Sequence, residues 1–333
     1  MNSTQKLTPA PYHKSTGAAR VRPFARTLPL VRLSAVLVLL AATQSFAAPN
    51  SIQTFPAGNG AWALTSDGAN IWVVDNDFFN GMVTKLRATD GAILGSFSVD
   101  SGPQGVTFDG ANIWVSNRYS NTVTKLRASD GTNLATVRVG HGPIGMIFDG
   151  ENIWAGNWSD GTLTKIRASD NQVLGTFHCN VLPIDLAFDG TNILVLNEEG
   201  DTVTKVLASD GTIQATFRIS DTGGDLHGIT YDGTNIWIGD SNNNRVIVLS
   251  DSDGTILGRP AAGTTPWGLT NDGLRIWVSE LLSNNVSRLG IRHGALQRLY
   301  PVGNEPRGII FDGTSVWVGN GLDKTVTKIS PGP

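Results

Sequence analysis

The stretch "FDGANIWVSNRYSNTVTKLRASDGT" (residues 108–132) decides the fold, because variants of it fill most of the chain. The aspartate of its Phe-Asp-Gly phrase recurs at intervals of 42, 40, 40, 43, 40 and 40 residues. These aspartates are Asp67, Asp109, Asp149, Asp189, Asp232, Asp272 and Asp312. Such a regular period is the signature of a repeat protein. The sequence therefore contains seven copies of one unit.

Each unit contains four short runs that are typical of β-strands. In the quoted copy they are "GVTF" (105–108), "NIWVS" (112–116), "TVTKLRA" (122–128) and "NLATVRV" (133–139), which we call strands a, b, c and d. The runs are rich in β-branched and aromatic residues and show no helical period. Asp-Gly turns separate several of them, as in β-hairpins. Four antiparallel strands in each of seven units predict an all-β, seven-bladed β-propeller.

The two ends of the repeat region indicate how the ring closes. The last copy stops after strand c, at "KISPGP" (328–333), and so lacks a strand d. The segment "SIQTFPA" (51–57) precedes the first copy and aligns with strand d. We predict that residues 51–56 complete the seventh blade, because closure hides two strand edges that would otherwise favour aggregation.

Residues 1–47 have the composition of an export signal. They contain six basic residues and no acidic ones, and "LSAVLVLLAA" (33–42) is apolar but too short to span a bilayer as a helix. Ser45 and Ala47 suit the small-residue positions of a signal-peptidase site. We expect cleavage after Ala47 and a periplasmic or extracellular protein, with the propeller formed by residues 48–333.

The charge and cysteine content of the remaining chain exclude several function classes. Without the leader, 19 basic residues stand against 28 acidic ones, a net charge of about −9. An acidic surface does not attract phosphate backbones, so nucleic acid is not an expected partner. Cys179 is the only cysteine, which excludes an internal disulfide and favours a buried, inert thiol. We expect a monomer with no membrane span after the leader.

One face of the predicted propeller carries the variable features. The d–a and b–c connections share a face, and the two copies that depart from the common length are longer there, at "DNDFFNGM" (75–82) and "SDTGGDLHG" (220–228). Variable loops on a rigid scaffold often carry function. Six of the nine tryptophans recur in strand b and are expected to pack between blades, namely Trp72, Trp114, Trp154, Trp237, Trp277 and Trp317. The others, Trp62, Trp158 and Trp267, map to the variable face and suggest a platform for sugars, aromatic ligands or peptides.

Two sets of equivalent positions should ring the channel mouth on this face. The position x of the Pro-x-Gly phrase at the start of strand a, or its equivalent where the phrase varies, holds Trp62, Gln104, Ile144, Ile184, His227, Trp267 or Arg307. The last residue of strand b is Asp75, Asn117, Asn157, Asn197, Asp240, Glu280 or Asn320. The second set favours a structural role, since short polar side chains fix turns by binding local backbone amides. The first set varies in size and polarity, so we predict ligand contacts from Trp62, Gln104, His227, Trp267 and Arg307.

His227 also permits an enzymatic interpretation. Asp240 ends the adjacent strand b of the same blade, and a carboxylate beside an imidazole suits a general base or a metal site. Carboxylates near the channel mouth, Asp75, Asp240 and Glu280, would be the candidate ligands of a divalent cation, magnesium or calcium. The candidate catalytic residues are His227, Asp240 and Glu280.

Two family resemblances accompany these patterns. The segment "IWVSNRYSNTVTKLRASDGT" (113–132) and its copies resemble bacterial YVTN and NHL propeller repeats, whereas the Gly-His and Trp-Asp dipeptides typical of WD40 repeats do not recur from copy to copy. "LHGITYDGTNIWIGD" (226–240) and "IWVSE" (276–280) resemble streptogramin lyases, seven-bladed propellers that open a cyclic depsipeptide with magnesium and a His/Glu constellation. By that resemblance His227 and Glu280 match ring positions of the lyase. Trp267 stands where a second histidine is expected, and Asp240 where glutamate is typical.

The sequence thus leaves two classes of function open. The first is an exported binding module that holds a small molecule, sugar or peptide through its d–a/b–c face. The second is a metal-assisted lyase or hydrolase, lyase-like or lactonase-like, with its site at the channel mouth.

Overall fold

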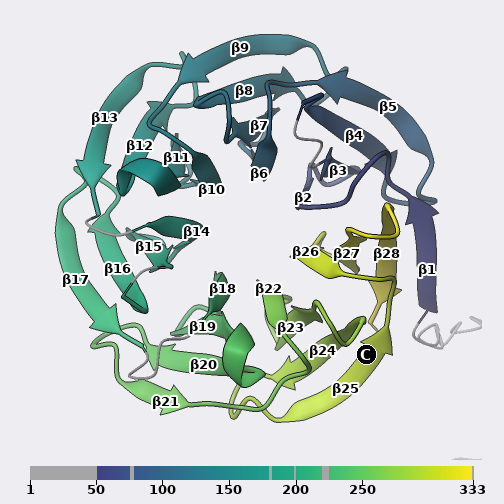
Figure 1. The fold of residues 1–333 in the computed structure, drawn as a ribbon, viewed down its shortest axis with the longest axis vertical. Coiled ribbons are helices and arrows are strands. Elements are labelled where there is room, and N and C mark those ends of the chain that lie inside the picture. The colour runs from purple at the N-terminus through teal and green to yellow at the C-terminus, as the bar shows by residue number, and fades with distance from the viewer. Residues whose placement is uncertain (1–50, 76–78, 180–181, 199, 220–224, 332–333) are drawn as a thin grey trace, which may run out of the picture. The chain divides into compact units, whose positions relative to one another are not determined.

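The computed structural model describes residues 51–75, 79–179, 182–198, 200–219 and 225–331. These residues form 28 strands in seven four-stranded antiparallel sheets, arranged in a ring (Figure 1). The predicted all-β, seven-bladed propeller is therefore confirmed. The predicted leader, residues 1–47, lies outside the described residues. No helix of the described part is long and apolar enough to cross a membrane.

The strands of equivalent position lie at the same radius of the ring (Figure 1). The innermost strands, a, are β2 (Leu64–Ser66), β6 (Pro103–Phe108), β10 (Pro143–Phe148), β14 (Pro183–Phe188), β18 (Leu226–Tyr231), β22 (Pro266–Asn271) and β26 (Pro306–Phe311). Strands b are β3 (Asn70–Asp75), β7 (Asn112–Asn117), β11 (Asn152–Asn157), β15 (Asn192–Asn197), β19 (Asn235–Asp240), β23 (Arg275–Glu280) and β27 (Val316–Asn320). Blades 1 to 7 are numbered in the order of these strands.

The two outer strands of each blade follow the same order. Strands c are β4 (Met82–Arg87), β8 (Thr122–Arg127), β12 (Thr162–Arg167), β16 (Thr202–Leu207), β20 (Arg245–Ser250), β24 (Asn285–Gly290) and β28 (Thr325–Ser330). Strands d are β5 (Ile93–Ser98), β9 (Asn133–Arg138), β13 (Val173–His178), β17 (Ile213–Arg218), β21 (Ile256–Gly258), β25 (Leu296–Pro301) and β1 (Ser51–Pro56). Two short 3-10 helices, η1 (Trp158–Asp160) and η2 (Ser241–Asn243), follow β11 and β19.

The N-terminal strand closes the ring as predicted. β1 pairs antiparallel with β28, from Ser51 opposite Ser330 to Pro56 opposite Thr325. The sheet of blade 7 therefore has the order β1-β28-β27-β26. Phe55 of β1 contacts Trp317 of β27, with 5.9 Å between ring centroids. This pairing covers the edge of β28 with a segment from the other end of the described chain.

The strand-b tryptophans are core residues, as their period predicts. Trp114 is fully buried, and its indole N–H donates to Oδ2 of Asp109 at 2.7 Å. All six of these tryptophans make the same bond to the aspartate of their own Asp-Gly turn. Oδ1 of Asp109 meanwhile accepts the backbone N–H groups of Ala111 and Asn112. The repeated aspartate thus fixes both the a–b turn and the tryptophan, a double role that the turn pattern alone does not indicate.

A lysine from strand c joins each of several blades to the next. Lys125 lies over the ring of Trp114, 4.8 Å from its centroid, and its Nζ donates to the carbonyl of Ala168 in blade 3 at 2.7 Å. Four lysines make this inter-blade bond to an alanine carbonyl, namely Lys85, Lys125, Lys165 and Lys328. The lysine charge is therefore stabilised by an aromatic face and a carbonyl at the blade junction.

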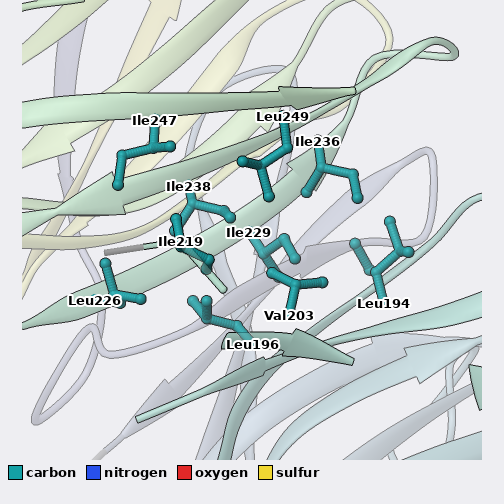
Figure 2. Close-up of a cluster of buried hydrophobic side chains, with 11 residues drawn as sticks. Leu194, Leu196, Val203, Ile219, Leu226, Ile229, Ile236, Ile238, Ile247 and Leu249 are labelled. Carbon is teal, nitrogen blue, oxygen red and sulfur yellow. The ribbon is translucent and has the colours of Figure 1, made fainter. Parts of the chain in front are cut away.

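Blade 4 departs from this pattern. It has Leu194 where the other blades have tryptophan, and Lys205 pairs instead with Asp189 and Asp251. The junction between blades 4 and 5 is consequently aliphatic, as Figure 2 shows. Its members include Leu194, Leu196, Val203, Ile219, Leu226, Ile229, Ile236, Ile238, Ile247 and Leu249. Cys179 is buried at the junction of blades 3 and 4, as expected for an inert thiol.

Candidate functional site

Strands a surround a cavity of about 590 Å³ that residues of all seven blades line. The equivalent wall positions are apolar throughout, namely Leu64, Val106, Met146, Leu186, Ile229, Leu269 and Ile309. The residue two positions before each of these in the sequence belongs to the rim on the d–a/b–c side. A cavity of this size falls in the range that holds small ligands. The first ring predicted from sequence therefore borders a real cavity.

Four residues of that ring form a continuous stack on one side of the rim. The guanidinium of Arg307 lies 4.1 Å from the ring centroid of Trp62 and 4.7 Å from that of Trp267. The imidazole of His227 also stacks on Trp267, with 3.8 Å between ring centroids and 16° between planes. The structure thus brings together Trp62, His227, Trp267 and Arg307 from blades 1, 5, 6 and 7. Gln104 and the isoleucines Ile144 and Ile184 also line the cavity.

Burial shifts the pKa values of the two basic side chains in this stack. Burial lowers the pKa of Arg307, and its bond to Glu305 at 3.2 Å opposes that shift. Burial also lowers the pKa of His227, and the nearby carboxylates of Asp225 and Glu198 oppose the shift without reversing it. The imidazole is therefore harder to protonate than a free histidine.

His227 does not pair with Asp240, so that predicted arrangement is wrong. Leu226 lies opposite Asp240 in the β18–β19 ladder, and His227 lies opposite Gly239. Successive side chains of a strand point to opposite faces, so His227 points away from the face that carries Asp240. Nε2 of His227 lies 3.2 Å from Oδ1 of Asp225 instead. Asp240 is fully buried and accepts bonds from Arg245 at 2.7 Å and from Asn243.

The ring at the end of strand b is mainly structural. Nδ2 of Asn117 donates to the hydroxyls of Thr122 and Thr124 on strand c, at 3.1 and 2.9 Å. Asn157, Asn197 and Asn320 make equivalent bonds. These asparagines fix the b–c turn as expected, although mainly by binding threonine hydroxyls of the next strand; Oδ1 of Asn320 also accepts the backbone N–H of Gly303.

The residues present do not fit the predicted metal ion. Within the described ranges, no group of three or more histidine, cysteine, aspartate or glutamate side chains is placed to hold a metal. Asp75, Asp240 and Glu280 end strands of blades 1, 5 and 6, and all three are buried inside their blades. A magnesium or calcium ion needs six or more oxygen ligands around one point, or fewer with several waters. We therefore derive no chemistry through a divalent ion.

Glu280 occupies an unusual environment for a carboxylate. The side chain is fully buried, and neither oxygen has a hydrogen bond of good geometry. Burial raises its pKa to about 7, and the nearby Gly263 amide and Ser287 hydroxyl oppose that shift only in part. A Cβ placed on Gly263 would lie 3.0 Å from Cδ of Glu280, so this glycine closes over the carboxyl group. Glu280 is thus covered by the connection between β21 and β22 and does not line the cavity.

Two features of the cavity were not predicted from sequence. On the rim opposite the stack, the guanidinium of Arg118 lies 4.7 Å from the ring of Trp158, whose indole N–H donates to Glu198. Inside the rim, Asp185 stands where the other blades have glycine or, in blade 1, alanine. Burial raises the pKa of Asp185 to about 6, although the backbone amides of Leu186 and Ile229 oppose that shift. The signal in the sequence was "PID" at a position where most copies read Pro-x-Gly.

Comparisons with known proteins identify the fold and no family. No protein-family model matches the chain, and no curated protein matches it. Among solved structures, the chain is similar to Kuenenia stuttgartiensis hydrazine synthase, with a TM-score of 0.73 and 16% identity. That match covers 82% of this chain and 96% of the other. Such low identity shows a shared propeller fold alone, because one fold supports many functions. The YVTN/NHL and lyase resemblances stay predictions.

Proposed function

We propose that this chain is a binding module that holds a small molecule, sugar or peptide at the cavity mouth. One observation carries the proposal: stacked aromatic and cationic side chains border an apolar cavity on the face where the loop lengths vary. Ligand sites in proteins are typically concave, largely apolar and supplied with a few placed polar groups. The rim supplies Trp62, Trp267 and Trp158 as flat surfaces, and Arg118, Glu198 and Arg307 as polar groups.

The rim is organised before any ligand arrives. Arg307 is held between two indoles and by Glu305, and Trp158 is held between Arg118 and Glu198. A side chain already fixed in place loses little conformational entropy on binding. The arrangement is therefore suited to binding a flat or apolar group without a large rearrangement of the rim.

Isothermal titration calorimetry tests the proposal with three probes: an oligosaccharide, an aromatic tripeptide and phenethylammonium. We expect at least one probe to bind, and its affinity to fall roughly tenfold in Trp267→Ala, as for loss of a stacking contact. Leu274→Ala is the matched control, because Leu274 is exposed in an a–b turn on the opposite face. No binding by any probe, or an equal loss in the control, would contradict the proposal.

We also propose that residues 1–47 direct export. Their basic charge, short apolar run and small residues near Ala47 support it. N-terminal sequencing of the protein recovered from a bacterial periplasm should begin at Ala48. A start at Met1 on the recovered protein would contradict export by cleavage.

The metal-assisted lyase or hydrolase has less support. Its candidate residues His227, Asp240 and Glu280 are separated by the register of β18 and by burial within blades 5 and 6. We therefore retain binding as the function that the geometry supports best.

A further inference from the structure

Asp185 is the one charged side chain that reaches the cavity wall beyond the rim, among the described residues. The other ionisable lining residues are Arg118, Glu198 and His227, and each is engaged in the rim. Asp185 has no basic partner, since its bonds are to two backbone amides. A partly buried carboxylate without a counter-charge is unfavourable unless something compensates for it.

The surrounding backbone holds this carboxylate in a fixed orientation. Oδ1 accepts the N–H of Leu186 at 2.9 Å, and Oδ2 accepts the N–H of Ile229 in blade 5 at 3.1 Å. Gly228, directly before Ile229, has a φ of 64°, in the left-handed region that favours glycine. Ile229 itself packs in the aliphatic cluster of Figure 2. The carboxylate is therefore anchored across the blade 4–5 junction.

The anchored carboxylate retains acceptor capacity toward the cavity. A carboxylate has about four lone-pair sites, and the two amides occupy two of them. A side chain at this position of the repeat is crowded. At the equivalent Gly145 of blade 3, an added Cβ would lie 2.8 Å from Cα of Asp185. The β14–β15 ladder shifts register at this point, as the equivalent ladders of blades 2 and 3 do, and Asp185 pairs with Leu196. The substitution of aspartate for glycine therefore adds a negative charge at a position where the other blades fold without one.

We propose that the cavity binds an organic ammonium ion, with the charged group on Asp185 and the apolar body against the apolar wall. This inference rests on the proposed binding function and names its ligand class. A divalent metal is disfavoured because one carboxylate with aliphatic neighbours cannot supply the oxygen ligands that such ions need. An ammonium group needs fewer acceptors, and an acidic protein surface attracts cations. The aromatic rim would contact the outer end of the ligand.

The pH dependence of binding follows from the groups that face Asp185. β10 and β15 carry no charged residue, and β18 carries only His227 and Tyr231 as titratable groups. Burial raises the pKa of Asp185 to about 6, so its negative charge is lost as pH falls through that value. Protonation of His227 at lower pH would repel a cation further. Ammonium binding should therefore weaken steadily on acidification below pH 7.

Calorimetry on the full-length protein tests the inference with phenethylammonium and its neutral isostere 2-phenylethanol. We expect the ammonium ion to bind roughly tenfold to a hundredfold more tightly, as for one charge-assisted hydrogen bond. Asp185→Asn and Asp185→Gly should remove that preference and leave alcohol binding unchanged. Asp185→Gly restores the residue of the repeat and so protects the test against a folding defect. Asp130→Asn is the control, since Asp130 is an exposed carboxylate of a c–d turn.

The outcomes separate this inference from the function on which it rests. Equal affinity for the two probes, or a preference that persists in both Asp185 variants, overturns the ammonium assignment and leaves a binding module standing. If neither probe binds and the oligosaccharide and tripeptide also fail, both proposals are overturned. A preference that disappears in the Asp185 variants and on acidification, but not in Asp130→Asn, establishes Asp185 as the cation anchor.

Discussion

Substitution of one strand-b tryptophan tests how the repeat is held together. Trp114 is fully buried, and its contacts divide into ring packing, the bond to Asp109 at 2.7 Å and the ammonium of Lys125 at 4.8 Å. Trp114→Ala removes all three and should cost about 3–5 kcal/mol of unfolding free energy. Trp114→Phe keeps an aromatic face but loses the indole N–H. We expect it to cost about 1–3 kcal/mol, from the lost hydrogen bond to a charged group and the smaller ring.

At acidic pH, the loss of unfolding free energy caused by Trp114→Phe should become smaller, because part of it depends on the charge of Asp109. Burial would raise the pKa of Asp109, but the bonds from Trp114, Asn112 and backbone amides outweigh it and lower the pKa below its usual value. A group with a lowered folded pKa stabilises the protein above its unfolded pKa, near 3.9, and loses that contribution as pH falls further. The gap between wild type and Trp114→Phe should therefore be constant above about pH 5 and smaller at pH 3.

Urea denaturation followed by far-UV circular dichroism measures both effects. Trp158→Phe serves as control, because Trp158 lies on the exposed rim and its loss should change the unfolding midpoint little. The interpretation of the repeat aspartate as a structural anchor fails if Trp114→Phe is as stable as wild type. It also fails if the gap does not change with pH, or if the Trp158 control is equally destabilised.

Three further predictions concern closure, the inter-blade lysines and Glu280. Removal of residues 51–56 should lower the melting temperature and promote aggregation by exposing the edge of β28, and an unchanged monomer on size-exclusion chromatography would contradict this. Lys125→Met should cost about 1–2 kcal/mol in urea denaturation through loss of the bond to Ala168, whereas no change would show that the junction does not need it. Burial raises the pKa of Glu280 to about 7, so its ionisation disfavours the folded state as pH rises from about 4.3 toward 7. Glu280→Gln should therefore raise the melting temperature at pH 8 but not at pH 4, and a uniform decrease would refute the buried-charge account.

The fold could be predicted from sequence because the same pattern of strand and turn residues recurs seven times. A single "NIWVS" run is ambiguous, but its recurrence with Asp-Gly turns fixes strand order, blade number and the position of the closing strand. The burial of the strand-b tryptophans follows from the same period. Alignment of the copies separates the residues that all copies share from those that vary. The features that depend on shared residues were therefore predictable.

The candidate site was predictable only where it reuses equivalent positions. Trp62, Trp267 and Arg307 were placed on one rim because they occupy the same position in different copies. The partner of His227 was assigned wrongly, since the choice between Asp225 and Asp240 depends on the side-chain face in the β18–β19 ladder. Contacts between copies, such as that of Trp158 with Glu198, depend on how neighbouring blades turn and have no signature within one copy.

Departures from the repeat concentrate where blades 4 and 5 meet. Leu194 replaces the tryptophan there, Asp185 replaces glycine, Gly228 adopts a left-handed conformation, and the interval from Asp189 to Asp232 is the longest of the six. Blades 1, 2, 3 and 7 close with the standard tryptophan and lysine and need none of these changes. At this junction the Ile229 amide binds the partly buried carboxylate of Asp185. The changes at this junction are therefore mutually consistent as the setting for one charged group, and this connects the irregular part of the fold to the cavity that we propose binds the ligand.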